Sequence, residues 1–125
     1  MPMKTEQPSE TVRLTRLPNG VRIITDNMPG LGTVSVGIWV ATGARFEPNE
    51  LNGAAHMLEH MVFKGTEKRS AIQIASDVEA VGGQMNAYTT RDTTAFYVRL
   101  LSEDLPLAVD VLSDLLLVPT LDPTE

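Results

Sequence analysis

The two histidines of this chain, His56 and His60, lie one helical turn apart, and Glu59 lies between them. On an α-helix, which turns about 100° per residue, the three side chains project within an arc of about 100°. Two imidazoles at this spacing can bind one zinc ion through ring nitrogens about 2.0–2.1 Å from the metal. A carboxylate beside them can accept a proton from a water molecule at the metal. The spacing therefore predicts metal-assisted hydrolysis, with His56 and His60 as zinc ligands and Glu59 as the general base.

A second interpretation of the same residues is an amphipathic helix whose histidines make ordinary hydrogen bonds. The opposite face of this helix carries an apolar stripe, formed by Ala54, Leu58, Met61 and Val62. A helix of either kind would bury such a stripe, so the stripe does not separate the two interpretations. The combination of two histidines and a glutamate at this spacing favours the metal-binding helix.

The composition indicates one folded domain. The 125 residues are 42% hydrophobic, which is enough for one core and too short a chain for two ordinary domains. The chain has no cysteine, which excludes disulfides and thiolate ligands, and its net charge of −6 argues against nucleic-acid binding. No apolar run approaches the length of a membrane span, and the first residues lack the apolar core of a signal peptide. We therefore expect a cytoplasmic protein without a membrane span, in which residues 1–11 form a disordered lead.

Hydrophobic periodicity predicts five strands and three helices. The strands are expected at 11–17, 21–26, 33–42, 84–90 and 93–101, and the helices around the two histidines, at 70–81 and from residue 102 onward. Asn19-Gly20 predicts a hairpin turn, and Ser70 with Gln73 predicts a capping box. The strand at 33–42 is apolar on both faces, so we expect it to be central. Strands joined by hairpins predict an α+β fold, a mostly antiparallel sheet with helices packed on one face.

The polar segment 84–90, which follows Gly82-Gly83, has two interpretations. It is either an exposed sheet edge that can pair with an extended peptide or an internal hairpin strand. The residue pattern alone leaves both open.

Three motifs resemble those of the insulinase or pitrilysin-type zinc peptidases, peptidase family M16. They are His-Met-Leu-Glu-His-Met-Val-Phe-Lys-Gly-Thr at 56–66, Gly-Gly-Gln-Met-Asn-Ala-Tyr-Thr at 82–89, and Leu-Pro-Leu-Ala-Val-Asp-Val-Leu-Ser-Asp at 105–114. The H-x-x-E-H pattern of the first motif is that of the inverzincins. The chain is most similar to the bacterial branch that resembles the mitochondrial processing peptidase β subunit. The resemblance runs from Val12 to the end of the chain and implies an N-terminal M16 domain at 12–125.

The resemblance implies a role for each residue that matches a family motif. His56 and His60 would bind Zn²⁺, and Glu59 would activate water for attack on a peptide carbonyl. Asn86 and Ala87 would belong to a substrate-binding edge strand, along which an extended peptide or an unfolded protein segment adds as a further strand. The implied activity is that of a zinc-dependent metalloendopeptidase.

The third metal ligand of the family is expected to be missing from this chain. In the family it is a glutamate downstream of the second histidine, and Glu79, Glu103 and Glu125 do not match its position. The resemblance therefore implies an incomplete LuxS/metallopeptidase-like domain, truncated before the third ligand and inactive when isolated. The missing C-terminal part, and a second M16 domain or subunit, are the expected partners. The alternative is a non-catalytic M16-type scaffold or partner subunit.

Overall fold

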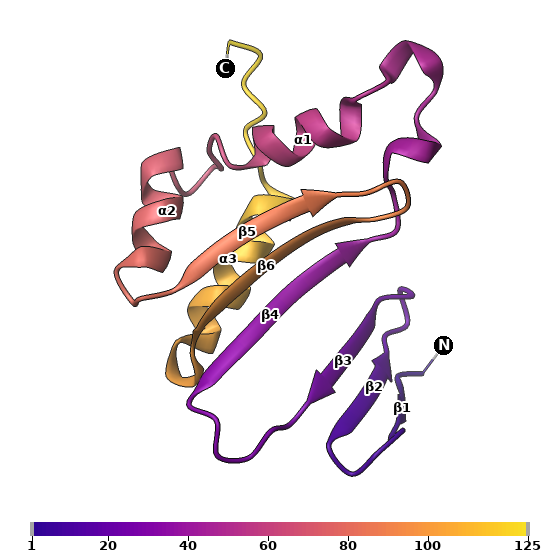
Figure 1. Ribbon diagram of the computed structural model, residues 1–125, viewed down its shortest axis with the longest axis vertical. Coiled ribbons are helices and arrows are strands. Elements are labelled where there is room, and N and C mark those ends of the chain that lie inside the picture. Colours follow the sequence, from indigo (N-terminus) through magenta and orange to yellow (C-terminus); the bar gives the residue numbers. More distant parts are fainter. Residues whose placement is uncertain (1, 125) are drawn as a thin grey trace. The chain divides into compact units, whose positions relative to one another are not determined.

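The structure of the protein is a computed structural model that describes residues 2–124. The chain forms two compact units, one up to Leu31 and one from Gly32 onward, and each is described by itself (Figure 1).

The first unit is a three-stranded antiparallel sheet. Its strands are β1 (Lys4–Glu6), β2 (Val12–Arg16) and β3 (Arg22–Asp26), in the spatial order β1-β2-β3. The predicted turn between β2 and β3 is present, and Gly20 adopts a positive φ of 90° there. Strand β1 lies within residues 1–11, for which the sequence predicted a disordered lead. Its residues are polar and exposed, so the local pattern carries no strand signal; pairing with β2 holds them in place.

The second unit combines a three-stranded sheet with three helices. The strands are β4 (Thr33–Val40), β5 (Gln84–Thr89) and β6 (Thr94–Leu101), all antiparallel, in the order β4-β6-β5. The helices are α1 (Ala54–Val62), α2 (Ala71–Glu79) and α3 (Leu105–Leu117), with short 3-10 turns at Ala44–Phe46, Asn49–Leu51 and Ser102–Asp104. The predicted α+β class is therefore confirmed. Within residues 2–124, no helix has both the length and the apolar character that crossing a membrane requires.

The core of this unit lies between one face of the sheet and the helices. Strand alternation puts Phe96, Val98 and Leu100 of β6 on the same face, and all three are buried. The helices cover this face with buried residues from each of them: Val62 of α1, Ile74 and Val78 of α2, and Ala108, Val111, Leu112 and Leu115 of α3. The helices thus pack on one face, as the sequence predicted.

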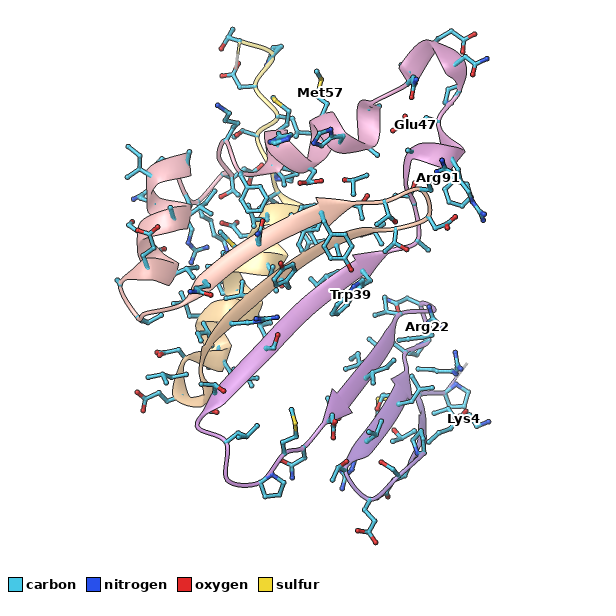
Figure 2. All side chains as sticks on the ribbon, in the orientation of Figure 1. Lys4, Arg22, Trp39, Glu47, Met57 and Arg91 are labelled. Atoms are coloured by element: carbon cyan, nitrogen blue, oxygen red, sulfur yellow. The ribbon has the colours of Figure 1, made fainter. Side chains whose placement is uncertain are left out.

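The order of the strands in this sheet corrects the prediction that the 33–42 strand is central. In this sheet β6 is the central strand and β4 lies at an edge. The apolar residues on the second face of β4 do not form a core. Trp39 is 61% exposed (Figure 2). It lies across Gly37 and donates a 3.1 Å hydrogen bond to the hydroxyl of Tyr88.

The start of α2 is as predicted from the sequence, and the start of α3 is not. Helix α2 begins with the predicted capping box, in which Gln73 N–H donates to Ser70 Oγ and Ser70 N–H donates to Gln73 Oε1. Ser102, in contrast, does not cap α3. It begins a 3-10 turn, and α3 starts at Leu105, followed by Pro106, which is well suited to a first helical turn.

Candidate active site

Helix α1 carries the three residues predicted for the metal site, and a side chain from outside the helix caps its N-terminus. Gly53 precedes the helix with a φ of 96° and has no side chain to offer as a cap. Glu47 takes this role, because its carboxylate accepts from Gly53 N–H at 2.6 Å and from Ala55 N–H at 2.7 Å. Both hydrogen bonds lower the pKa of Glu47, and the one from Ala55 has the larger effect. A negative charge at this end also suits the helix dipole.

The loop that contains Glu47 packs against the turn between β5 and β6. Ala44 N–H donates to the Thr90 carbonyl at 3.1 Å, and Arg45 N–H donates to the Arg91 carbonyl at 3.0 Å. Gly43 is required at this contact, because a Cβ there would collide with the Thr90 carbonyl oxygen. The segment before α1 is therefore fixed to the end of the β5–β6 hairpin, and Figure 2 shows Glu47 and Arg91 in this region.

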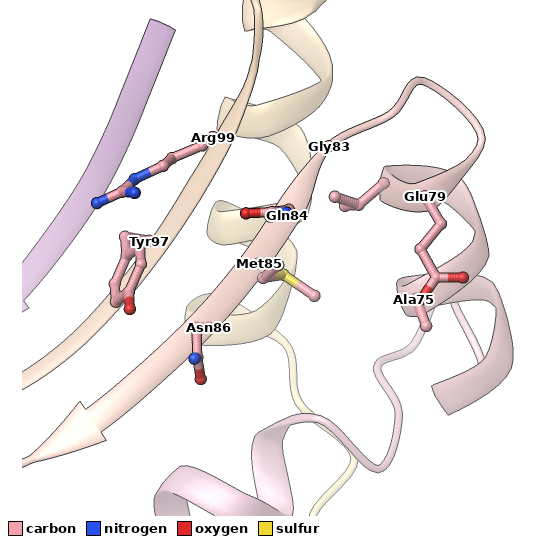
Figure 3. Close-up of a pocket in the computed structure, with 9 residues that line it drawn as sticks. Ala75, Glu79, Gly83, Gln84, Met85, Asn86, Tyr97 and Arg99 are labelled. Atoms are coloured by element: carbon pink, nitrogen blue, oxygen red, sulfur yellow. The ribbon is translucent and has the colours of Figure 1, made fainter.

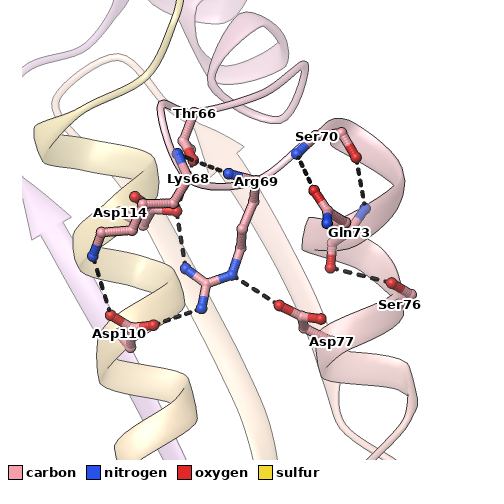
Figure 4. Close-up of polar contacts among 9 residues, drawn as sticks. All are labelled: Thr66, Lys68, Arg69, Ser70, Gln73, Ser76, Asp77, Asp110 and Asp114. Atoms are coloured by element: carbon pink, nitrogen blue, oxygen red, sulfur yellow. Dashed lines mark hydrogen bonds and ion pairs between the residues drawn. The ribbon is translucent and has the colours of Figure 1, made fainter.

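The segment after α1 is held by a cluster of charged residues centred on Arg69 (Figure 4). The Arg69 guanidinium donates to Asp77 of α2 at 2.8 Å, to Asp110 of α3 at 2.5 Å and to Asp114 of α3 at 2.9 Å. Asp114 is buried and also accepts a 2.7 Å hydrogen bond from Thr66. These carboxylates raise the pKa of Arg69 above its ordinary value, and Asp110 has the largest effect. The Arg69 cluster thus joins the segment that follows α1 to both other helices.

The structure brings His56, Glu59 and His60 together on one side of α1. The Nε2 atoms of the two histidines lie 3.0 Å apart, and the ligand atoms of all three residues lie within 4.8 Å of one another. Two nitrogens bound to one tetrahedral zinc ion at about 2.0–2.1 Å are roughly 3.3 Å apart. The observed separation is close to that value, so the donor set fits zinc. The histidines are exposed to solvent, and Glu59 is half-buried.

Glu59 has a hydrogen-bond partner that was not predicted from the sequence. Thr89, at the end of β5, donates from its hydroxyl to Glu59 Oε2 at 2.6 Å. The signal for it was present, because Thr89 closes the motif at 82–89 and alternates with Ala87 on one face of the strand.

Strand β5 lies at the edge of its sheet, which resolves the choice between an edge and an internal strand. Thr90 N–H donates to the Thr93 carbonyl, so residues 90 and 93 form a hydrogen-bonded pair. Because such pairs alternate along an antiparallel ladder, Gln84, Asn86 and Tyr88 bond to β6. Met85, Ala87 and Thr89 therefore direct their backbone N–H and C=O groups toward the free edge.

The two residues predicted to bind substrate meet at this edge. The side-chain oxygen of Asn86 accepts a 2.8 Å hydrogen bond from Ala87 N–H, a donor that points away from β6. Asn86 thus satisfies a backbone group that an added strand would otherwise use. Their role in substrate binding stays a prediction.

Two clefts lie along β5. The one at its C-terminal end has a volume of about 640 Å³ and is lined by His56, Glu59, Ala87 and Thr89, among others. The other, of about 550 Å³, lies at the N-terminal end, where Ala75 and Glu79 of α2 face the strand (Figure 3). Two of the three candidate metal-site residues, His56 and Glu59, therefore line a cleft together with residues of the edge strand.

No second carboxylate joins the candidate metal site within residues 2–124. Among these residues, the one group of three or more potential ligands is His56, Glu59 and His60. Glu79 and Glu103 lie outside it, as the sequence analysis expected.

An α+β fold that presents an H-x-x-E-H helix is the arrangement expected for a metal-dependent peptidase domain. Comparison with known proteins gives the family: residues 22–125 match insulinase (peptidase family M16), and the chain belongs to this family. This confirms the resemblance seen in the sequence.

Several relatives share about half of their aligned residues with this chain. An uncharacterized zinc protease of Streptomyces coelicolor is 51% identical over 91% of the chain and 25% of its own length. A probable mitochondrial-processing peptidase subunit beta of Arabidopsis thaliana is 45% identical over 83% of the chain and 20% of its own length. An uncharacterized zinc protease of Bacillus subtilis is 45% identical over 86% of the chain and 26% of its own length. The chain therefore spans about a quarter of the length of the relatives it matches.

Proposed function

We propose that this chain carries the zinc-binding and peptide-binding part of a metalloendopeptidase. The observation that supports this most directly is the placement of the two Nε2 atoms 3.0 Å apart, with the Glu59 carboxylate within 4.8 Å of both. Membership of a peptidase family and the names of the relatives, zinc proteases, also support it.

In this proposal His56 and His60 hold the metal, and Glu59 moves the proton. A zinc ion held there would supply Lewis-acid polarisation of a water molecule and of the scissile carbonyl. Glu59 accepts a proton from the water as its oxygen bonds to the carbonyl carbon. Glu59 then gives this proton to the leaving nitrogen as the carbon–nitrogen bond breaks. One water molecule is consumed, and one carboxyl and one amino terminus are formed.

The proposed substrate is an extended peptide or an unfolded protein segment that adds to β5 as a further strand. Ala87 offers an N–H and a C=O group at the free edge, in the cleft that also contains His56 and Glu59. For the peptide to use Ala87 N–H, the Asn86 side chain must turn away, and its amide is then available to the peptide. A peptide bound there has its backbone next to the proposed base.

The proposed site needs a third protein ligand from outside residues 2–124. A catalytic zinc ion usually has three protein ligands and one open position, and the described residues supply two histidines besides the base. About three quarters of the relatives' length lies outside the aligned part. We place the third ligand, a glutamate, and a second M16 domain in that part, or the second M16 domain in a separate subunit.

The function is tested by removing the base and the ligands separately, in the chain extended to the length of its relatives. Glu59→Gln keeps both histidines, so we expect zinc to stay bound while peptide hydrolysis falls by about 10²–10⁴. His56→Ala and His60→Ala should each remove the zinc, which metal analysis after dialysis would show.

Two outcomes would contradict the proposal. Wild-type turnover by Glu59→Gln would exclude Glu59 as the base. A wild-type protein that binds zinc and partner subunits but hydrolyses no peptide would support the non-catalytic scaffold instead.

A further inference from the structure

We propose that Thr89 is a positioning residue that aligns the Glu59 carboxylate with a peptide bound along β5. The inference rests on the proposed function, because it assigns Glu59 the role of base. Its observation is independent of that role: the Thr89 hydroxyl donates a 2.6 Å hydrogen bond to Glu59 Oε2, between residues 30 positions apart.

The backbone of Thr89 belongs to the proposed peptide-binding edge. Alternation along β5 directs its N–H and C=O groups toward the free edge, as it does for Ala87 two residues before. Its side chain points to the helix-covered face of the sheet, where α1 lies. Thr89 therefore belongs to the edge on which the substrate would bind and also contacts the proposed base.

The chemistry of this contact suits the orientation of a carboxylate. A hydroxyl that donates to an ionised carboxylate forms a short, strong hydrogen bond. Thr89 uses Oε2, which leaves Oε1 available to accept a proton from water. The β-branched side chain of threonine has restricted rotation about χ1, so the strand backbone fixes the direction of the hydroxyl. Without this bond, the Glu59 carboxylate would rotate about its terminal torsion, which has a broad energy minimum.

The first test measures the contact in the 125-residue chain without any substrate. Thr89→Val keeps the shape of the side chain and removes the donor, and Glu59→Ala removes the acceptor. A double-mutant cycle in urea should show a coupling of about tenfold or more in the unfolding equilibrium constant. Additive effects would show that the contact does not form in solution and would overturn the inference.

The second test measures catalysis in the extended protein. Thr89→Val should lower kcat by about 10- to 100-fold with little change in KM or in zinc affinity, because the edge backbone and both histidines remain. Thr89→Ser, which restores the hydroxyl, should recover most of kcat. A residue with only a structural role would not give this rescue together with an unchanged KM.

Thr94→Val is the matched control. Thr94 lies opposite Thr89 on β6 and is buried, but its hydroxyl donates to the Thr42 carbonyl instead of to the site. We expect this variant to be less stable and to keep the wild-type kcat.

The result also separates this inference from the proposed function. If Glu59→Gln abolishes hydrolysis while Thr89→Val keeps the wild-type kcat, the Thr89 role is wrong and the proposed function stands. If the wild-type protein binds zinc and hydrolyses nothing, the proposed function fails, and the Thr89 role in catalysis fails with it, whatever the coupling measured in urea.

Discussion

A proline at Ala87 would remove a different kind of backbone N–H group from a proline at the adjacent Tyr88. Its N–H points to the free edge and is satisfied by the Asn86 side chain. The N–H of Tyr88 instead points to β6 by the alternation of the ladder. The same substitution at adjacent positions therefore removes either an edge donor or an internal ladder bond.

Ala87→Pro should leave the fold intact and weaken peptide binding. Proline is tolerated where the N–H faces away from the neighbouring strand, and one lost backbone hydrogen bond weakens binding by about 2- to 10-fold. The dissociation constant of an extended peptide, measured in the Glu59→Gln background so that it is not cleaved, would report this change. Circular dichroism would report the fold.

The control for this prediction is Tyr88→Pro, compared with Tyr88→Ala so that loss of the side chain is accounted for. This proline removes a bond to β6 and should unfold the hairpin. Equal damage to the fold from Ala87→Pro would mean that Ala87 N–H is needed inside the sheet.

Among the elements, α1 is short and depends on contacts at both ends. It has nine residues, and isolated helices below about 12–15 residues are marginal in water. Glu47 caps its start, and the Arg69 cluster holds the segment after its end. Neither contact includes a metal-site residue, yet both determine where His56 and His60 lie relative to β5.

The Arg69 cluster should make stability depend on pH in the acid range. The Arg69 guanidinium lowers the pKa of Asp110 below its ordinary value of 3.8. As the pH falls, the unfolded chain therefore binds a proton at this residue before the folded chain does. The contribution of Asp110 is complete above pH about 4 and is lost as the pH falls through the lower, folded-state pKa.

Asp110→Asn should therefore be less stable than the wild type at neutral pH, by no more than about 1 kcal/mol because this carboxylate is half exposed. The difference should shrink toward about pH 3. Urea unfolding of both proteins over this range measures it. A difference that stays constant with pH would mean that the contact stabilises through shape and not through charge.

The sequence predicted those elements whose ends are set by strong local preferences. Asn19-Gly20 and Gly82-Gly83 mark the ends of β2 and α2, and Ser70 with Gln73 marks the start of α2. Strand β1 was missed because cross-strand partners stabilise it, and the central position of β6 was missed because strand order depends on pairing.

The part of the candidate site that lies on one helix could be predicted from the sequence, and the contacts from other elements could not. One helical turn suffices to bring His56, Glu59 and His60 together, so their spacing was informative. Glu47 lies 8 residues before Ala55, which donates a hydrogen bond to it, and Thr89 lies 30 residues after Glu59. The motif at 82–89 marks Thr89 as a candidate residue, but no local pattern names its partner, so the fold is needed to show these contacts.

At the scale of the whole molecule, the second unit exposes large apolar side chains on the outer sides of its helices. Met57 and Leu58 of α1 are 67% and 51% exposed, Ile72 of α2 is 79% exposed and Leu117 of α3 is 78% exposed. Large apolar side chains exposed on the surface favour association. We expect the 125-residue chain to dimerise or aggregate at high concentration, which sedimentation or light scattering would show.

The same chain should bind zinc weakly and hydrolyse no peptide. Within residues 2–124 the site offers two histidines and the proposed base, and no further ligand joins them. Loss of residues that only support metal ligands weakens metal binding by about 10–100-fold. The lack of a ligating carboxylate should cost at least as much, because it also leaves the dication with one negative charge fewer. The zinc dissociation constant of this chain should therefore lie at least that far above the constant of the chain extended to the length of its relatives, and hydrolysis should appear only in the extended protein. Should the 125-residue chain alone retain zinc through dialysis and cleave a peptide, another carboxylate, Glu79 or Glu103, must move to complete the site.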